Sequence, residues 1–73
     1  MEFNEVLKIF GTNVYKKRTK IGMTRKELSI KTGIRKEYLK KIEEGSAKGI
    51  LCSHIFRIAQ ALKIEPYEIC EGI

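Results

Sequence analysis

The sequence predicts an all-α fold, a compact bundle of five helices whose second and third members form a helix-turn-helix. Apolar residues recur at spacings of three and four along several segments, and no segment shows a convincing strand-like alternation. Two helix-length patterns are separated only by Gly33 and Ile34, so the helices must pack closely. The small Ser29 stands where they would nearly touch.

The first helix is expected over residues 4–20. Its apolar residues follow one another at spacings of four, three and four and form one stripe: Phe3, Leu7, Phe10 and Val14. Asn4 is the expected N-cap, and Gly22 suits the left-handed residue just past the helix end. Gly11 costs about 1 kcal/mol relative to Ala inside a helix. Close approach of another backbone would explain it.

The second helix has the best-marked start in the chain. Thr24 and Glu27 have the spacing of a capping box, and Met23 and Leu28 that of a hydrophobic staple. The helix is expected to end near residue 32, because Gly33 readily takes a positive φ.

The third helix is expected over residues 36–44, with Gly45 after its end. Its start is poorly marked, because the Arg35 side chain cannot accept a hydrogen bond from the amides of the first turn. A loop at residues 46–49 then leads to a fourth helix over residues 53–62. The fourth helix is expected to bury four apolar side chains: Ile55, Ile58, Ala59 and Leu62. A short fifth helix begins with Pro66 as its first residue.

At 73 residues, with 42% apolar content, the chain is expected to form one domain over residues 1–73. So small a core gains from a partner subunit. A signal-peptide layout and an apolar run of about 18 residues are both missing, so we expect a cytoplasmic protein with no membrane partner. Cys52 and Cys70 are expected to be reduced, packing residues, because a secreted disulfide scaffold normally has more cysteines.

The net charge of +6 is unevenly distributed. Residues 14–41 hold eleven Lys and Arg against Glu27 and Glu37, a net charge of +9, whereas the rest of the chain carries −3. A basic block between acidic ends favours a polyanion on one face of the molecule. The alternative is an ordinary solvated run of charge.

Part of the basic block lies on the third helix, the second member of the predicted helix pair. An apolar seam between the two helices is expected from four residues: Leu28, Ile34, Leu39 and Ile42. Opposite the seam the third helix carries a polar, mostly basic face: Lys36, Glu37, Lys40 and Lys41. A tight helix pair that turns such a face outward is how a protein places side chains in a DNA major groove. The alternative is a merely solubilising helix face.

This order of residues resembles the helix-turn-helix domain of the lambdoid phage repressor and Cro family (the xenobiotic-response-element type), over about residues 10–70. The resemblance rests on motif residues in every part of the domain: Phe10-Gly11, Val14, Arg18, Thr24, Leu28-Ser29, Gly33-Ile34, Leu39, Ile42-Glu43, Gly45, Ile58-Ala59 and Ala61-Leu62. It implies a repressor-type bundle and double-stranded DNA as the partner. Departures at Ser29, Arg25, Arg35 and Ile50 bear on base preference and not on the fold.

The resemblance implies that Lys36, Glu37 and Lys41 read base edges. Lysine can donate to guanine and glutamate can accept from cytosine, although Glu37 and Lys41 are also spaced for an ordinary ion pair. It also implies an ion pair between Arg18 and Glu43, whose loss would leave a buried charge.

Five further side chains are expected at phosphates: Arg25, Lys26, Arg35, Tyr38 and Lys40. The first three lie at helix N-termini, where unpaired amides and the helix dipole favour anions. Tyr38 could instead pack at the helix edge.

The sequence therefore favours a sequence-specific transcriptional regulator, a dimeric repressor of a palindromic operator, either Cro-like or like the controller proteins of restriction–modification systems. Tyr67, Ile69 and Ile73 are the expected dimer surface. The alternative is a protein-binding module, such as an antitoxin that uses the acidic C-terminal face. An enzyme is disfavoured, because His54 is the only histidine and no catalytic set can be assembled around it. We expect no metal, no cofactor and no small-molecule effector.

Overall fold

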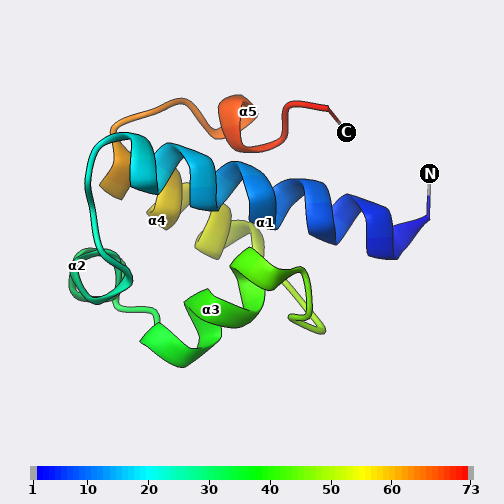
Figure 1. Ribbon diagram of the computed structural model, residues 1–73, viewed down its shortest axis with the longest axis horizontal. Coiled ribbons are helices and arrows are strands. Elements are labelled where there is room, and N and C mark those ends of the chain that lie inside the picture. The colour runs from blue at the N-terminus through cyan, green and yellow to red at the C-terminus, as the bar shows by residue number, and fades with distance from the viewer. Residues whose placement is uncertain (1, 73) are drawn as a thin grey trace.

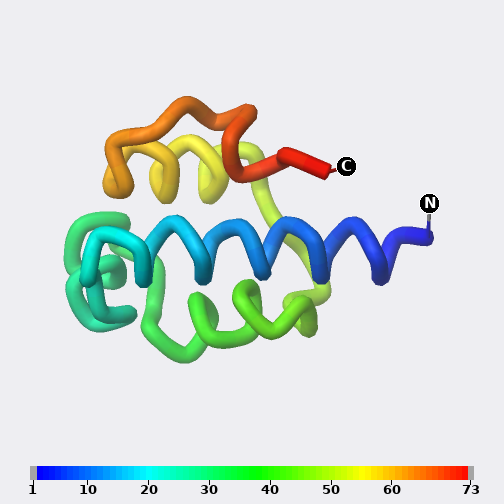
Figure 2. The backbone as a smooth tube through the Cα atoms, turned by 45° about the horizontal axis from the view of Figure 1, so that its top comes forward, coloured from blue at the N-terminus to red at the C-terminus, as the bar shows by residue number. Residues whose placement is uncertain are grey.

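The computed structural model describes residues 2–72, within which the fold consists of five α-helices and no strand. They are α1 (Phe3–Lys20), α2 (Arg25–Thr32), α3 (Lys36–Glu44), α4 (Cys52–Leu62) and α5 (Pro66–Ile69). The long α1 lies between α3 on one side and α4 with α5 on the other (Figure 2), and Figure 1 shows α5 and α3 on opposite sides of α1. The predicted all-α class and five-helix order are confirmed. Within the same residues no helix has both the length and the apolar character needed to cross a bilayer.

Both ends of α2 are fixed by side chains that are close to one another in sequence. Thr24 Oγ1 accepts from the Glu27 amide at 3.1 Å, and the Thr24 amide donates to Glu27 Oε1 at 3.2 Å, which completes the predicted capping box. Gly33 has a φ of 76°, as the turn requires. Ser29 Oγ donates to the Ile34 carbonyl at 2.6 Å, which ties the end of α2 to the turn.

The start of α1 differs from the expectation in two ways. The helix begins at Phe3 with Glu2 as its N-cap, so Asn4 lies inside the helix and does not cap it. Phe3 is exposed and does not join the core stripe formed by Leu7, Phe10 and Val14. The physical reason is visible in Figure 1, where the first turn of α1 extends past the other helices and nothing covers it.

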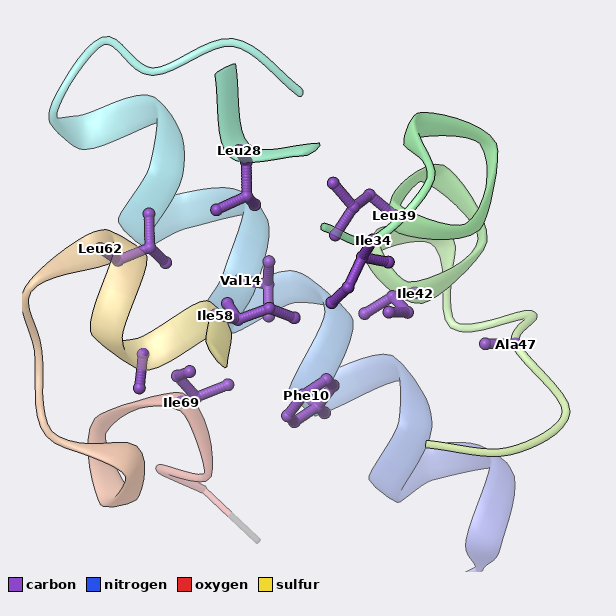
Figure 3. Packing of buried hydrophobic residues seen from close by; sticks show 11 residues of the cluster. Phe10, Val14, Leu28, Ile34, Leu39, Ile42, Ala47, Ile58, Leu62 and Ile69 are labelled. Carbon is purple, nitrogen blue, oxygen red and sulfur yellow. The ribbon is translucent and has the colours of Figure 1, made fainter. Parts of the chain in front are cut away.

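The core gathers side chains from all five helices and from the turn (Figure 3). The predicted seam of Leu28, Ile34, Leu39 and Ile42 is buried, as are Phe10 and Val14 of α1. Ile58, Ala59 and Leu62 fill the space from α4, whereas Ile55 is only partly buried. Ala47, within the expected loop, is also buried, and its amide donates to the Lys41 carbonyl at 3.2 Å.

The two cysteines are free thiols, but only one of them packs as expected. Cys70 is partly buried against the core, whereas Cys52 is exposed at the first position of α4. The α4 helix begins one residue earlier than predicted, with Leu51 as its N-cap. The packing expectation for Cys52 is therefore wrong, because the first turn of α4 turns this side chain away from the core.

At Gly11 the backbone of α1 lies directly against the backbone of α3. A Cβ atom at this position would lie 2.1 Å from the Ile42 carbonyl oxygen and 2.8 Å from that of Glu43. Both neighbours are backbone atoms of α3, which cannot rotate away. The absence of a side chain at Gly11 therefore lets α1 pack directly against the last turn of α3.

We expect Gly11→Ala to lower the free energy of unfolding by about 1–3 kcal/mol, the usual cost of overpacking, despite the better helix propensity of alanine. Urea unfolding followed by circular dichroism measures this change. Gly49→Ala is the matched control, because a Cβ atom there meets nothing within 4 Å. Equal stability of the two variants would contradict the close approach.

Candidate nucleic-acid interface

The exposed face of α3 carries the residues expected to meet DNA. Lys36, Glu37, Lys40 and Lys41 are all exposed, whereas Leu39 and Ile42 are fully buried beneath them. Arg35 is the N-cap residue and makes no side-chain capping bond, so the first amides of α3 are left for another acceptor. An anion is the natural partner of such a helix start.

A buried carboxylate holds the helix pair against α1. Glu43 Oε2 accepts from Arg18 Nε at 2.7 Å, and Glu43 Oε1 accepts from Arg18 Nη2 at 3.0 Å. This is the pair that the sequence analysis expected, with the Glu43 side chain only 2% exposed and that of Arg18 8%. Arg18 Nη1 also donates to the Met23 carbonyl at 2.7 Å. One guanidinium therefore joins α1 to α3 and to the α1–α2 turn.

Arg25 is the second partner of the Glu43 carboxylate, and this pairing was not predicted from the sequence. Its Nε donates to Glu43 Oε1 at 2.9 Å, and its side chain is 33% exposed. Within residues 2–72 its terminal amino groups make no hydrogen bond. No sequence spacing predicts this ion pair, because Arg25 and Glu43 lie on different helices. Their opposite charges were the only indication of it. Arg25 is thus held by its inner nitrogen and still reaches the surface.

Arg25 and Lys36 border two neighbouring hollows at the start of α2 and α3. One hollow of about 310 Å³ is lined by these two residues together with Glu37 and Lys40. The other also has Lys26 in its wall. The fold therefore brings five of the expected DNA-binding residues together: Arg25, Lys26, Lys36, Glu37 and Lys40. Positive charge dominates this surface, which suits the phosphates of a nucleic-acid backbone.

The other candidates lie on the far flank of α3. Arg35, Glu37 and Lys41 line a shallow hollow together with Tyr38. Glu37 and Lys41 do not approach within 4.0 Å as an ion pair among residues 2–72, so the ordinary pairing considered from their spacing does not form. Both side chains are left at the surface.

Tyr38 does not have the free hydroxyl that phosphate binding requires. Its hydroxyl donates to the Gly49 carbonyl, and its ring packs edge-on against His54, with 5.4 Å between ring centroids. A tyrosine has one hydroxyl proton, which is used here. In this structure the Tyr38 hydroxyl is therefore engaged within the chain and is not directed to a phosphate, and Tyr38 holds the loop after α3.

The expected dimer residues are separated by the fold. Ile69 is fully buried, and its carbonyl accepts from Asn13 Nδ2 on α1 at 2.6 Å. Its assignment to a dimer surface is wrong, because α1 and α4 already cover it within one chain. Tyr67 is 69% exposed. Ile73 lies outside the described residues.

Comparison with protein families identifies the domain. Residues 16–73 match the family model of the Cro/C1-type HTH DNA-binding domain, a range that includes α2 and α3. The chain belongs to the Cro/C1-type helix-turn-helix family. The members of this family are DNA-binding regulators and not enzymes.

A solved structure adds a closer likeness. The fold is similar to the high-resolution crystal structure of the restriction-modification controller protein C.AhdI from Aeromonas hydrophila, with a TM-score of 0.82 and 30% sequence identity. The alignment covers 86% of this chain and 94% of the controller chain. A comparison with curated protein sequences found no match.

We expect Glu43→Gln to lower the free energy of unfolding by about 3–5 kcal/mol, because it leaves the buried guanidinium of Arg18 without its counter-charge. Urea unfolding gives the value. Glu44→Gln removes an exposed charge from the adjacent position and should change stability by less than about 0.5 kcal/mol. Equal, small effects of the two substitutions would show that the buried pair does not hold the helices.

Proposed function

We propose that this protein is a transcriptional regulator of the restriction–modification controller kind, which represses by binding a short palindromic operator as a homodimer. The exposed basic face of α3, on a Cro/C1-type domain, is the observation that carries this proposal. The likeness to C.AhdI favours the controller kind over a Cro-like phage repressor. A lone domain of this size reads only a few base pairs, so two half-sites give the useful specificity.

In the proposed complex α3 lies in the major groove with its first half against the bases. Lys36 and Lys41 donate to guanine O6 or N7, and Glu37 accepts from a cytosine amino group. Support comes from the exposure of all three side chains and from the lack of an ion pair between Glu37 and Lys41 within residues 2–72. Without a cytosine amino group to accept from, the Glu37 carboxylate would only be repelled by the DNA phosphates. Its need for a cytosine at that position therefore restricts the DNA sequence that is bound.

In this proposal Arg25 is the main residue that binds a DNA backbone phosphate. Glu43 fixes its Nε, and the partly exposed Arg25 side chain lines one hollow with Lys26 and Lys36, where a backbone phosphate can accept from its terminal amino groups. Because the guanidinium is already oriented, little side-chain entropy is lost on binding. Arg35, Lys26 and Lys40 add contacts along the same strand.

The proposed dimer uses the α4–α5 side of the molecule. Leu51, Phe56 and Tyr67 are large apolar side chains exposed there, where a partner would remove them from water. This side is separated from α3 by α1 (Figure 2), so a dimer formed through it leaves both α3 helices uncovered.

The function is tested by selecting bound sites from random duplex DNA and measuring the mass of the protein in solution and on the selected site. We expect an inverted repeat whose half-sites lie about one helical turn apart, occupied by two copies of the 8.4 kDa chain. An unrepeated site bound by one copy would overturn the dimer. Failure to enrich any sequence, together with a stoichiometric protein partner, would favour the antitoxin alternative.

We expect Lys36→Ala and Lys41→Ala each to weaken binding to the selected site by about 1–3 kcal/mol, with little effect on random DNA. Titrations at several salt concentrations make the test sharper. A base contact should leave the logarithmic salt slope nearly unchanged, whereas loss of a phosphate contact reduces it by about 1.

Lys31→Ala is the matched control for these two variants, because it removes one exposed lysine from α2 outside the hollows that border α3. Equal losses on selected and random DNA for Lys36→Ala or Lys41→Ala would contradict base reading at that position.

A further inference from the structure

A second basic surface lies behind the α1–α2 turn, away from α3. It is a hollow of about 530 Å³ between the end of α1, the end of α2 and the α4–α5 connection. Its lining is mainly apolar and comes from segments far apart in the chain: Ile21, Met23, Ala61, Leu62 and Ile64. A volume of this size falls within the range of pockets that hold small molecules.

Four lysines surround this apolar floor, two from α1, one from α2 and one at the end of α4: Lys17, Lys20, Lys31 and Lys63. One carboxylate, that of Glu68, lies among them, 3.9 Å from Lys17 Nζ. Within residues 2–72, Lys20, Lys31 and Lys63 have no carboxylate within 4.0 Å. The rim therefore carries a net charge of +3, and like charges that share one hollow repel one another unless an anion joins them.

We propose that this hollow, hereafter the lysine pocket, binds a small amphipathic anion, a molecule with an apolar body and one carboxylate, sulfonate or phosphate group. The apolar body covers Ile21, Met23 and Ile64, and the acidic group lies among the lysines. The lysines favour an anion and the apolar lining favours an apolar body, so both features favour the same class of ligand. This proposal does not depend on which DNA sequence α3 binds.

The lysine pocket shares a wall with the DNA surface. Met23 lines both the lysine pocket and the hollow that contains Arg25 and Lys26. The carbonyl of Met23 accepts from Arg18, whose guanidinium also binds Glu43. A ligand in the lysine pocket therefore rests on the turn that leads into α2 and lies one residue from its capping box.

The test uses anilinonaphthalene sulfonate, a fluorescent amphipathic anion, on the intact chain at a temperature where it is folded. We expect saturable binding to one site, displacement by decanoate, and no displacement by the uncharged decanol. Lys20→Gln and Lys63→Gln should each weaken binding about two- to fivefold, the strength of an exposed ion pair. Ile21→Gln should also weaken binding of the probe, because it removes part of the apolar lining of the pocket.

Two matched controls lie outside the lysine pocket, also at exposed residues. Lys48→Gln removes a surface lysine from the loop after α3, and Ile30→Gln removes an exposed isoleucine from α2. Neither should alter the affinity for the probe. Because every substituted side chain is exposed, circular dichroism should show unchanged folding for all the variants.

Three results would overturn the proposal. Decanol that displaces the probe as well as decanoate would show a purely apolar site. Equal weakening by the control variants would show non-specific attraction to a basic protein. Binding of an acidic peptide at this surface, with no binding of decanoate, would assign it to a protein partner instead.

Discussion

The carboxylate of Glu43 is the interaction on which the rest of the molecule depends. It is almost fully buried and accepts from two guanidinium groups, those of Arg18 on α1 and Arg25 on α2. A charge withdrawn from water is tolerated only when its partners are close and well aligned, so the three helices cannot shift relative to one another without exposing an unpaired charge. The orientation of α3 is thereby fixed by electrostatics as well as by packing.

Packing works on the same end of α3. Gly11 lets the backbone of α1 approach the carbonyl oxygens of Ile42 and Glu43, so the last turn of α3 is pressed against the long helix. The first turn is not covered in this way and begins without a side-chain cap at Arg35. One helix thus has an anchored end and a free end. The free end carries Lys36 and Glu37, where a groove of DNA can receive them.

The basic block of the sequence proves to be two surfaces in space. Lys26 and Lys36 lie with Arg25 around a hollow at the starts of α2 and α3, whereas the other lysines line the lysine pocket behind the α1–α2 turn. Met23 separates them and contributes to both. Positive charge on this chain therefore cannot be assigned to DNA binding as a whole, because the two groups of lysines line different hollows.

The amino-acid sequence alone determined the helices, the turn between α2 and α3, the buried seam and the outward face of α3. These follow from interactions within a few residues, such as the Thr24–Glu27 capping box, the positive φ of Gly33 and the period of apolar side chains. Tertiary structure decided the contacts between distant segments. It joined Arg25 to Glu43, gave the Tyr38 hydroxyl to Gly49, buried Ile69 against α1 and left Phe3 exposed, because each outcome depends on which helix lies beside that side chain. The lysine pocket likewise has no sequence motif, since its lysines come from three helices and meet only after the chain has folded.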